Sequence, residues 1–377
     1  MRGEYIMLRM MTAGESHGNK IVGVLDGMPS GLKLDMSCLR WFMERRRGGY
    51  GRGKRMEIEM DEPKVVGGVH DGVTTGAPIL VELENRGDNP SFGVRSVPRP
   101  GHADYVGYLK YGLEDLNIPA ERASARETAI RTLLGAICYL ALRELDIEVF
   151  AFTRSIGKVS LERKYHEIED LLSKRDSSPV YCPDERVSEL MVEEIDLAKS
   201  KGESLGGSFT VVARNVPLGL GSYVQWDRRL DAALGFSLLS IPSVKAVEIG
   251  EAIDGSKMYG SEFQDGFIVK NGVVRRVSNR AGGIEGGVSN GEDIVITAYL
   301  KPIPTAPAID RSVDLKTMEE SPLAYIRSDT VVVPAASVVG EAMVSFTLLS
   351  FLLEKFGGDS MSELKRRVEE WRGRLSR

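Results

Sequence analysis

Residues 121–145 read Glu-Arg-Ala-Ser-Ala-Arg-Glu-Thr-Ala-Ile-Arg-Thr-Leu-Leu-Gly-Ala-Ile-Cys-Tyr-Leu-Ala-Leu-Arg-Glu-Leu, and they contain the clearest helical pattern of the chain. Apolar side chains recur every three or four positions, which predicts an amphipathic helix over about 125–145. A stripe of this width normally faces the core of a globular protein. The stripe is formed by Ile130, Leu133, Leu134, Ile137, Leu140 and Ala141.

The start of this helix combines a capping signal with cations. Ser124 and Glu127 have the spacing of a capping box, so we expect the helix to begin at Ser124. Its free N–H groups and the positive end of its dipole would then lie beside Arg122 and Arg126 and would bind a phosphate or another anion. The alternative is a plain helix cap whose arginines face solvent.

Strand-like and helical patterns follow one another along the rest of the chain, which predicts a mixed α and β fold. Alternating or short apolar runs predict strands over 56–61, 79–83, 208–213, 266–274 and 294–300. A second long helix begins near Ala335 and ends at Gly357-Gly358, an ordinary C-terminal signal. The last helix has four apolar residues on one face, Leu364, Val368, Trp371 and Leu375.

Two segments of the chain resemble each other. Gly67-Gly-Val-His-Asp-Gly72 and Gly286-Gly-Val-Ser-Asn-Gly291 each precede an apolar, strand-like run. They either record an internal duplication, with two similar sheet layers facing each other, or are ordinary turns that recur by chance. Because the chain has no low-complexity linker, we expect one domain over residues 1–377, with the polar stretch 158–203 as a peripheral helical insertion.

Composition limits the class of protein. The chain has 377 residues, 42% hydrophobic and 27% charged, as in soluble globular proteins. Its net charge of -5 and pI near 5.7 argue against a dedicated nucleic-acid binder, which is usually basic. Cys38, Cys138 and Cys182 are scattered, so we expect no disulfide framework and no metal site. Without a signal peptide, and with no apolar run longer than that around 346–353, we expect a cytoplasmic protein and no membrane partner.

Positive charge is concentrated between Arg45 and Arg55, in the sequence Arg-Arg-Arg-Gly-Gly-Tyr-Gly-Arg-Gly-Lys-Arg. Six of these eleven residues are cations and four are glycines. Glycine lets the backbone bend and approach a ligand closely, and guanidinium groups bind phosphate and carboxylate with two hydrogen bonds. We therefore expect a loop that binds an anion. A solvated basic loop or a nucleic-acid patch is the alternative.

Two of the four histidines stand in turn-like settings. His17 lies between glycines in Gly14-Glu-Ser-His-Gly18, and His102 lies in Arg99-Pro-Gly-His-Ala-Asp104. A turn exposes an imidazole to a ligand, and imidazole exchanges protons near neutral pH. A structural histidine is the alternative. The other two histidines are interpreted as surface residues.

Three later segments complete the candidate site. Residues 281–291 form a glycine-rich loop that allows close approach by a flat or phosphorylated ligand, although it matches neither the dinucleotide-binding nor the phosphate-loop pattern. Lys301-Pro-Ile-Pro-Thr305 is a proline-stiffened turn with a cation, and Arg327-Ser-Asp329 precedes an apolar run. Together, these segments predict a pocket with many cations, two histidines and one acid.

These motifs resemble those of one family, the chorismate synthases, over essentially the whole chain. The resemblance implies an α+β fold, a large single-domain β-α-β sandwich assembled as a homotetramer. It implies conversion of 5-enolpyruvylshikimate 3-phosphate to chorismate by 1,4-anti elimination of phosphate and a ring hydrogen, which requires reduced FMN without net redox change. It rests on segments 13–18, 45–55, 99–104, 122–128, 219–227, 282–291, 301–305 and 327–329.

The resemblance also implies roles for single residues. His17 would act as a general acid toward the departing phosphate, His102 would control flavin protonation, and Asp329 would act near the flavin N5 when the hydrogen is removed. Five arginines would hold the anions of the substrate, Arg46, Arg52, Arg55, Arg126 and Arg327. Flavin contacts would come from Ser124, Ala125, Arg126, Pro242, Ser243, Gly286, Lys301, Pro302, Ile303, Pro304, Thr305 and Arg327.

Fungal members of this family also reduce flavin with NADPH. This chain has the length of the bacterial type and no reductase-like segment, so we expect NADPH to act only indirectly, through an external flavin reductase. Two other hypotheses compete with the lyase, a nucleic-acid binder and a flavin-dependent oxidoreductase. The acidic pI and the lack of interleaved aromatic residues beyond Tyr50 argue against the first. The second predicts net consumption of reduced flavin.

Overall fold

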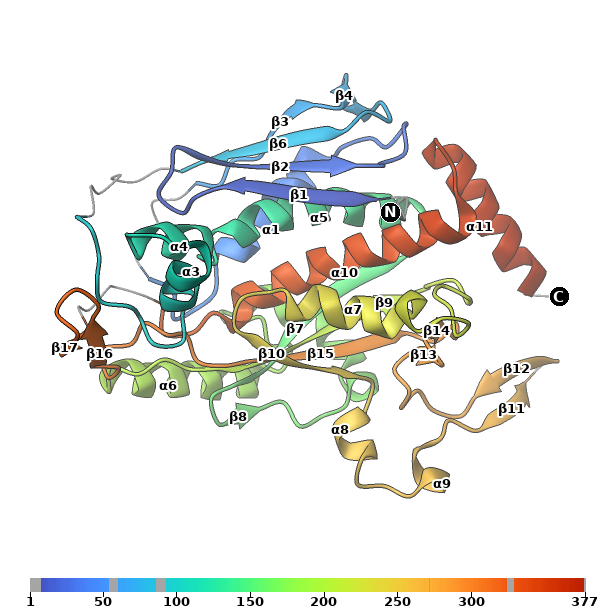
Figure 1. Cartoon of the computed structure of the whole chain (residues 1–377). Helices are drawn as coiled ribbons and strands as arrows, with labels where there is room; N and C mark the ends of the chain where they lie inside the picture. The colour runs from blue at the N-terminus through green and yellow to red at the C-terminus, as the bar shows by residue number, and fades with distance from the viewer. Residues whose placement is uncertain (1–7, 54–59, 86–92, 271, 324–328, 376–377) are drawn as a thin grey trace.

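Two antiparallel sheets enclose a layer of helices (Figure 1). The computed structural model describes residues 8–53, 60–85, 93–270, 272–323 and 329–375. The first sheet has the strand order β1 (Arg9–Gly14), β2 (Lys20–Asp26), β6 (Ile79–Glu84), β3 (Lys64–Gly67). The second has the order β10 (Val244–Ile249), β15 (Ile294–Leu300), β9 (Gly207–Arg214), β7 (Glu148–Ile156), β8 (Val159–Ser160). The predicted β-α-β sandwich of an α+β fold is therefore confirmed.

Three helices form the middle layer, α1 (Met36–Arg47), α5 (Glu127–Glu144) and α10 (Val333–Phe356). Strand β2 alternates between buried and less buried residues, and its Ile21 and Leu25 are fully buried. Helix α5 contacts β2 on one side and α10 on the other. It is therefore buried on nearly all sides from Thr128 to Leu142. The buried surface of the helix is thus wider than the single apolar stripe that we expected.

Two glycines allow the middle layer to pack closely. A Cβ atom at Gly135 of α5 would lie 2.4 Å from the carbonyl oxygen of Ala342 on α10. A Cβ atom at Gly340 of α10 would lie 2.3 Å from the ring of Phe209 on β9. Larger side chains at these two positions would push the layers apart.

Helix α10 is the longest helix of the described residues, and it is apolar. By length and composition it could cross a membrane, so the expectation that no apolar run reaches that length was wrong. However, 83% of its most apolar window is buried inside the protein, against α5, β7 and β9. Its apolar composition is explained by its place between the two sheets.

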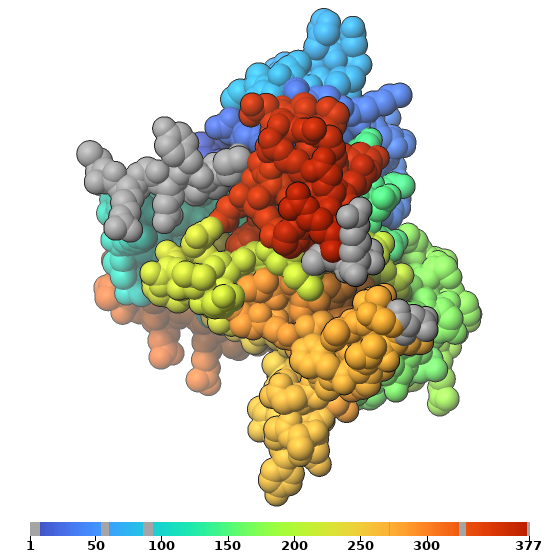
Figure 2. Space-filling view, turned by 90° about the vertical axis from the view of Figure 1, so that its right-hand side faces the viewer, coloured from blue at the N-terminus to red at the C-terminus, as the bar shows by residue number. Residues whose placement is uncertain are grey.

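The remaining elements surround this sandwich. The strand expected over 266–274 is instead a hairpin of β11 (Phe267–Lys270) and β12 (Val273–Arg276). The chain turns at Gly272, whose φ of 76° lies in the left-handed region that favours glycine. This hairpin and the two short helices before it project from the body (Figure 2). The other elements are α3 (Asp104–Tyr111), α4 (Asn117–Arg122), α7 (Leu230–Leu239), α8 (Ala252–Gly255), α9 (Gly260–Phe263), β16 (Arg311–Asp314), β17 (Glu319–Pro322) and α11 (Met361–Leu375).

The polar stretch 158–203 contains α6 (Glu185–Ser200), which contacts β7 and β8, and the 3-10 helices Tyr165–Glu167 and Glu169–Ser177. The two similar glycine segments occupy comparable places. Each lies in a short hairpin directly before a strand that is second from the edge of its sheet. The hairpins are β4 (Val69–His70) with β5 (Val73–Thr74), and β13 (Ile284–Glu285) with β14 (Val288–Ser289).

Candidate active site

Helix α5 begins at Glu127, and the capping box predicted at Ser124 is not formed. The hydroxyl of Ser124 accepts a hydrogen bond from Arg126 N at 3.3 Å, and its carbonyl accepts one from Glu127 N at 3.2 Å. Thr128 N donates to the carbonyl of Ala125 at 3.1 Å. The amides of Arg126, Glu127 and Thr128 already have acceptors within the turn that follows α4. The prediction that these N–H groups are free to bind an anion was therefore wrong.

The arginine segment does not form one loop, because Arg45, Arg46 and Arg47 are the last turn of α1. Arg45 points into the core. Its guanidinium donates to both carboxylate oxygens of Glu341 on α10, at 3.2 and 3.0 Å, and lies 4.2 Å from the ring centre of Trp41. Arg45 is therefore a packing residue, and only part of the predicted cationic segment faces the candidate site.

Arg46 is turned toward the start of α5. Its Nη2 donates to the carbonyl oxygen of Ala125 at 2.9 Å and to the hydroxyl of Thr128 at 3.1 Å. The neighbouring Arg126 donates through Nη1 to Asp61 at 2.5 Å and through Nε to Asn85 at 2.9 Å. Arg46 Nη1 lies 3.7 Å from the other oxygen of Asp61. Two buried guanidinium groups thus converge on one buried carboxylate.

A second pair joins the arginine segment to the segment before α10. Arg52 Nη1 lies 3.2 Å from Asp329 Oδ2, and Gly53 N donates to Asp329 Oδ1 at 2.6 Å. Thr330 N donates to the carbonyl of Gly51 at 2.8 Å. The structure therefore brings together the predicted residues Arg52 and Asp329. The predicted residues Arg55 and Arg327, and most of the strand expected over 56–61, lie outside the described residues.

His17 is held by a carboxylate. Its Nδ1 lies 2.8 Å from Glu121 Oε1, and its backbone N–H donates to Glu121 Oε2 at 2.7 Å. The preceding residue, Ser16, is buried, and its hydroxyl accepts from Ser124 at 3.2 Å. His17 therefore lies beside the segment that precedes α5. The imidazole is oriented through Nδ1.

His102 belongs to a more buried cluster. Its Nδ1 lies 2.5 Å from Asp104, and the same carboxylate accepts from Arg99 at 2.8 Å and from Arg95 at 2.6 Å. Burial alone would raise the pKa of Asp104, but the hydrogen bonds and charges of His102 and Arg99 outweigh it and hold this pKa well below its ordinary value. Asp104 thus stays ionised and fixes the ring of His102.

The turn 301–305 lies against the His102 segment. Lys301 Nζ donates to the carbonyl of Gly101 at 3.0 Å, and Lys301 N donates to the carbonyl of Ser243 at 2.9 Å. Burial, with the charge of Lys245, lowers the pKa of Lys301. The predicted flavin segments 242–243 and 301–305 are therefore adjacent to each other and to the turn that carries His102.

Gly286 is not part of this arrangement. It lies in the β13–β14 hairpin before β15, whereas Lys301 directly follows the end of that strand. The nearest side-chain atom to a Cβ built at Gly286 belongs to Tyr223. Because β15 has seven residues and a strand rises about 3.3 Å per residue, the two positions are separated by the length of the strand.

Three carboxylates that orient the predicted site residues were not among the functional residues predicted from the sequence. Glu121 holds His17, Asp104 holds His102, and Asp61 holds Arg46 and Arg126. Glu121 and Asp104 stand inside the quoted motifs, so an acid close to a histidine or an arginine was an available signal. Asp61 ended a run of alternating residues, and nothing in that pattern indicated which cations it would meet.

These features define a class of protein, a β-α-β sandwich in which two histidines and several arginines are each held by a carboxylate. The family model of chorismate synthase matches residues 8–353. A chorismate synthase of Thermotoga sp. strain RQ2 is 45% identical over 360 residues, covering 96% of this chain and 95% of that protein. One of Desulforudis audaxviator is 48% identical over 373 residues, covering 95% of each. A solved crystal structure of chorismate synthase has a TM-score of 0.81 at 37% identity and covers 98% of both chains. The chain belongs to the chorismate synthase family.

Proposed function

We propose that this chain converts 5-enolpyruvylshikimate 3-phosphate to chorismate, as a lyase that eliminates phosphate and a ring hydrogen in a 1,4-anti sense without net redox change. The observation that carries the proposal is the family match over residues 8–353. Its support in the structure is the meeting of family motifs around the start of α5. The substrate has two carboxylates and a phosphate, which are the groups that guanidinium forks bind best.

Arg46 and Arg126 are the proposed centre of substrate binding, together with Arg52, Arg55 and Arg327. Both are buried and both face Asp61. An anion that is desolvated beside two guanidinium groups is held far more strongly than on the surface. Asp61 keeps these cations in place and competes with the incoming anion for them.

Proton transfer is proposed for His17 and Asp329. Since His17 Nδ1 is engaged by Glu121, its Nε2 would give the proton to the departing phosphate. Asp329 is held by Arg52 and by Gly53 N, and it would take part in removing the ring hydrogen. Each group is thus oriented by a neighbour before substrate arrives, which favours catalysis.

The residues present fit a phosphorylated flavin. The segments 124–126, 242–243 and 301–305 offer hydroxyl groups, backbone groups and the cations Arg126 and Lys301, next to apolar Ile303 and two prolines. Gly101 approaches so closely that a Cβ there would lie 3.2 Å from Lys301 Nζ. Reduced FMN, when bound, would supply electron density as phosphate leaves. His102, fixed by Asp104, would control the protonation of the flavin.

Three further features are proposed. NADPH would act only through an external flavin reductase, the protein would be cytoplasmic, and it would assemble as a homotetramer. Large apolar side chains on the surface near α7 support assembly, since Tyr223, Trp226 and Phe236 are each more than three quarters exposed, at 79%, 77% and 78%. Light scattering on the purified protein should give four times the mass of the 41.4 kDa chain.

Anaerobic turnover tests the proposed activity. The protein is incubated with 5-enolpyruvylshikimate 3-phosphate and chemically reduced FMN, and chorismate is followed by absorbance, with oxidised FMN as the control. We expect one phosphate per chorismate and no net loss of reduced flavin. Stoichiometric flavin oxidation would favour the oxidoreductase hypothesis instead. A folded protein that forms no chorismate would contradict the proposal.

A further inference from the structure

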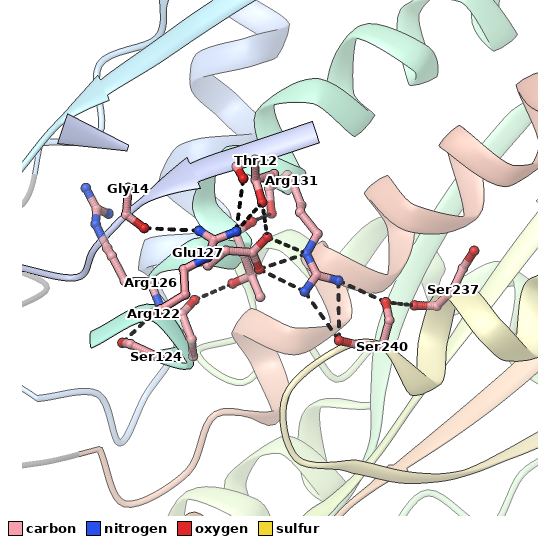
Figure 3. A network of polar contacts seen from close by, with 12 residues as sticks. Thr12, Gly14, Arg122, Ser124, Arg126, Glu127, Arg131, Ser237 and Ser240 are labelled. Carbon is pink, nitrogen blue, oxygen red and sulfur yellow. Dashed lines mark hydrogen bonds and ion pairs between the residues drawn. The ribbon is translucent and has the colours of Figure 1, made fainter. Parts of the chain in front are cut away.

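A network of polar contacts links β1 to the turn after α7 (Figure 3). Thr12 donates to Glu127 Oε1 at 2.7 Å, and Arg131 Nε donates to Glu127 Oε2 at 2.8 Å. On its other side, Arg131 Nη1 donates to the hydroxyl of Ser240 at 2.9 Å and to its carbonyl at 3.3 Å. We call Glu127, Arg131 and Ser240 the strap.

The strap ends next to two different parts of the candidate site. Glu127 directly follows Arg126 at the start of α5. Ser240 ends α7 and is three residues before Ser243, whose carbonyl accepts from Lys301 N at 2.9 Å. The strap therefore ties the start of a middle-layer helix to the edge of the second sheet. These are two of the places from which the proposed flavin contacts come.

The geometry of the strap fixes the distance between Glu127 and Ser240. The guanidinium group of Arg131 is planar and rigid, and its Nε and Nη2 both lie 2.8 Å from Glu127 Oε2. Its Nη1 is directed at Ser240, and Nη2 makes a second, longer contact of 3.3 Å with the Ser240 carbonyl. The side chains of Arg131 and Glu127 are only 17% and 12% exposed, so water screens this pair little. Burial alone would raise the pKa of Glu127, but Arg131 and Thr12 outweigh it and lower this pKa.

The far end of the strap is anchored as well. The hydroxyl of Ser240 donates to the carbonyl of Ser237 at 2.6 Å, while it accepts from Arg131. The hydroxyl of Ser237 lies 2.6 Å from that of Thr347 on α10, and both are buried. A movement of the turn after α7 would therefore break contacts on both sides of Ser240.

We propose that Arg131 is a positioning residue that sets the separation between the start of α5 and the turn 241–243. This proposal rests on the proposed flavin site, because its functional consequence is the fit of FMN between these two segments. A displacement of about 1 Å at a binding segment can cost a factor of up to about a hundred in function. Loss of the strap should therefore loosen the turn and weaken FMN binding.

The first test measures the protein without ligand. Arg131→Met keeps the length and helical propensity of the side chain but removes every contact of the strap. Hydrogen exchange should become at least about tenfold faster at the amides of 243–244 and of Lys301, since these lie beyond Ser240. The matched control is Arg367→Met, because Arg367 also joins a glutamate four residues earlier, Glu363, to the carbonyl of another helix, Phe356.

The second test measures FMN affinity by fluorescence titration. Arg131→Met should raise the dissociation constant about tenfold or more, Arg131→Lys should restore part of the affinity, and the Arg367→Met control should match the unaltered chain. If Arg131→Met does not fold, Ser240→Ala provides the same comparison with a smaller effect. Unchanged exchange and unchanged FMN affinity in a folded Arg131→Met protein would overturn the proposal. An unaltered chain that binds no FMN would overturn the flavin site first, and the strap's role with it.

Discussion

Arg45 and Arg46 are neighbours on α1, and each belongs to a pair of arginines around one buried carboxylate. Arg45 and Arg175 surround Glu341, which is completely buried and also accepts from Ala151 N at 3.2 Å. Arg46 and Arg126 surround Asp61, which is held in a left-handed backbone conformation with a φ of 46°. Two guanidinium groups around one carboxylate thus occur both in the core and in the candidate site.

The surroundings of the two clusters differ in a way that explains their tasks. Glu341 stands on the apolar helix α10 and receives hydrogen bonds from α1 and β7, so its cluster joins three elements of the core. Asp61 stands outside any helix or strand, and its arginines come from the ends of two helices. We infer that the cluster between helix ends can exchange its carboxylate for a ligand, whereas the cluster between packed elements is held in place by the packing.

The largest effect is expected in the site cluster. Arg126→Met should lower kcat/KM about a hundredfold to a thousandfold, because it removes a buried cation that we propose faces the anions of the substrate. The measurement is the anaerobic chorismate assay at equal concentrations of folded protein. Arg45→Met is the matched control from the core cluster, and it should affect stability rather than kcat/KM. Equal losses of kcat/KM in both variants would break the comparison.

The next effect concerns the core cluster. Glu341→Gln should reduce the free energy of unfolding by about 3 kcal/mol, since it leaves two buried guanidinium groups without their carboxylate. Denaturant unfolding measures this change. Activity per folded molecule should stay near that of the unaltered chain. A stable Glu341→Gln protein would show that the core cluster is no more than a packing arrangement.

Sequence reasoning identified the fold where patterns are local. The strand 294–300 and the helix that ends at Phe356 match the structure, because alternation and glycine signals depend only on neighbouring residues. The start of α5 was misplaced at Ser124, since Glu127 bonds to Thr12 and Arg131 and not to the cap. Contacts with residues far away in the sequence decided where the Glu127 side chain points, and the local sequence pattern does not reveal such contacts.

The candidate site was predictable in its residue types and not in its pairings. Arg45 and Arg46 differ only by one position, about 100° around the helix, and this rotation sends one to the core and the other to the site. Their carboxylates, Glu341 and Asp61, are 296 and 15 positions away, one of them across nearly the whole chain. Which acid meets which arginine is decided by the stacking of layers.

A smaller effect, on phosphate binding, should distinguish Asp61 from Glu341. Asp61→Asn should tighten the binding of inorganic phosphate to the ligand-free protein about tenfold, because the carboxylate no longer competes for Arg46 and Arg126. Isothermal titration calorimetry measures the dissociation constant. Glu341→Gln should leave it unchanged. Weaker phosphate binding in Asp61→Asn would mean that Asp61 chiefly orients the arginines, and the proposed exchange of anions would be wrong.

A third cluster, Arg95 and Arg99 around Asp104, extends the comparison to pH. The pKa of Asp104 is held below its ordinary value of 3.8, so its ionised form stabilises the fold above that pH, and this stability is lost as the pH falls further. Asp104→Asn should destabilise the protein at pH 7. At pH 3 the difference between the two proteins should be smaller by about 1 kcal/mol, because only the unaltered chain gains a proton at position 104 on unfolding.

Denaturant unfolding at both pH values measures this difference, and Asp115→Asn is a useful control. Asp115 also has a lowered pKa, but it is less buried and accepts mainly from backbone N–H groups and Asn117. Its substitution should therefore cost less at pH 7. If the penalty of Asp104→Asn does not shrink at low pH, the carboxylate is not held ionised by its arginines, and this cluster differs from the one around Asp61 in kind.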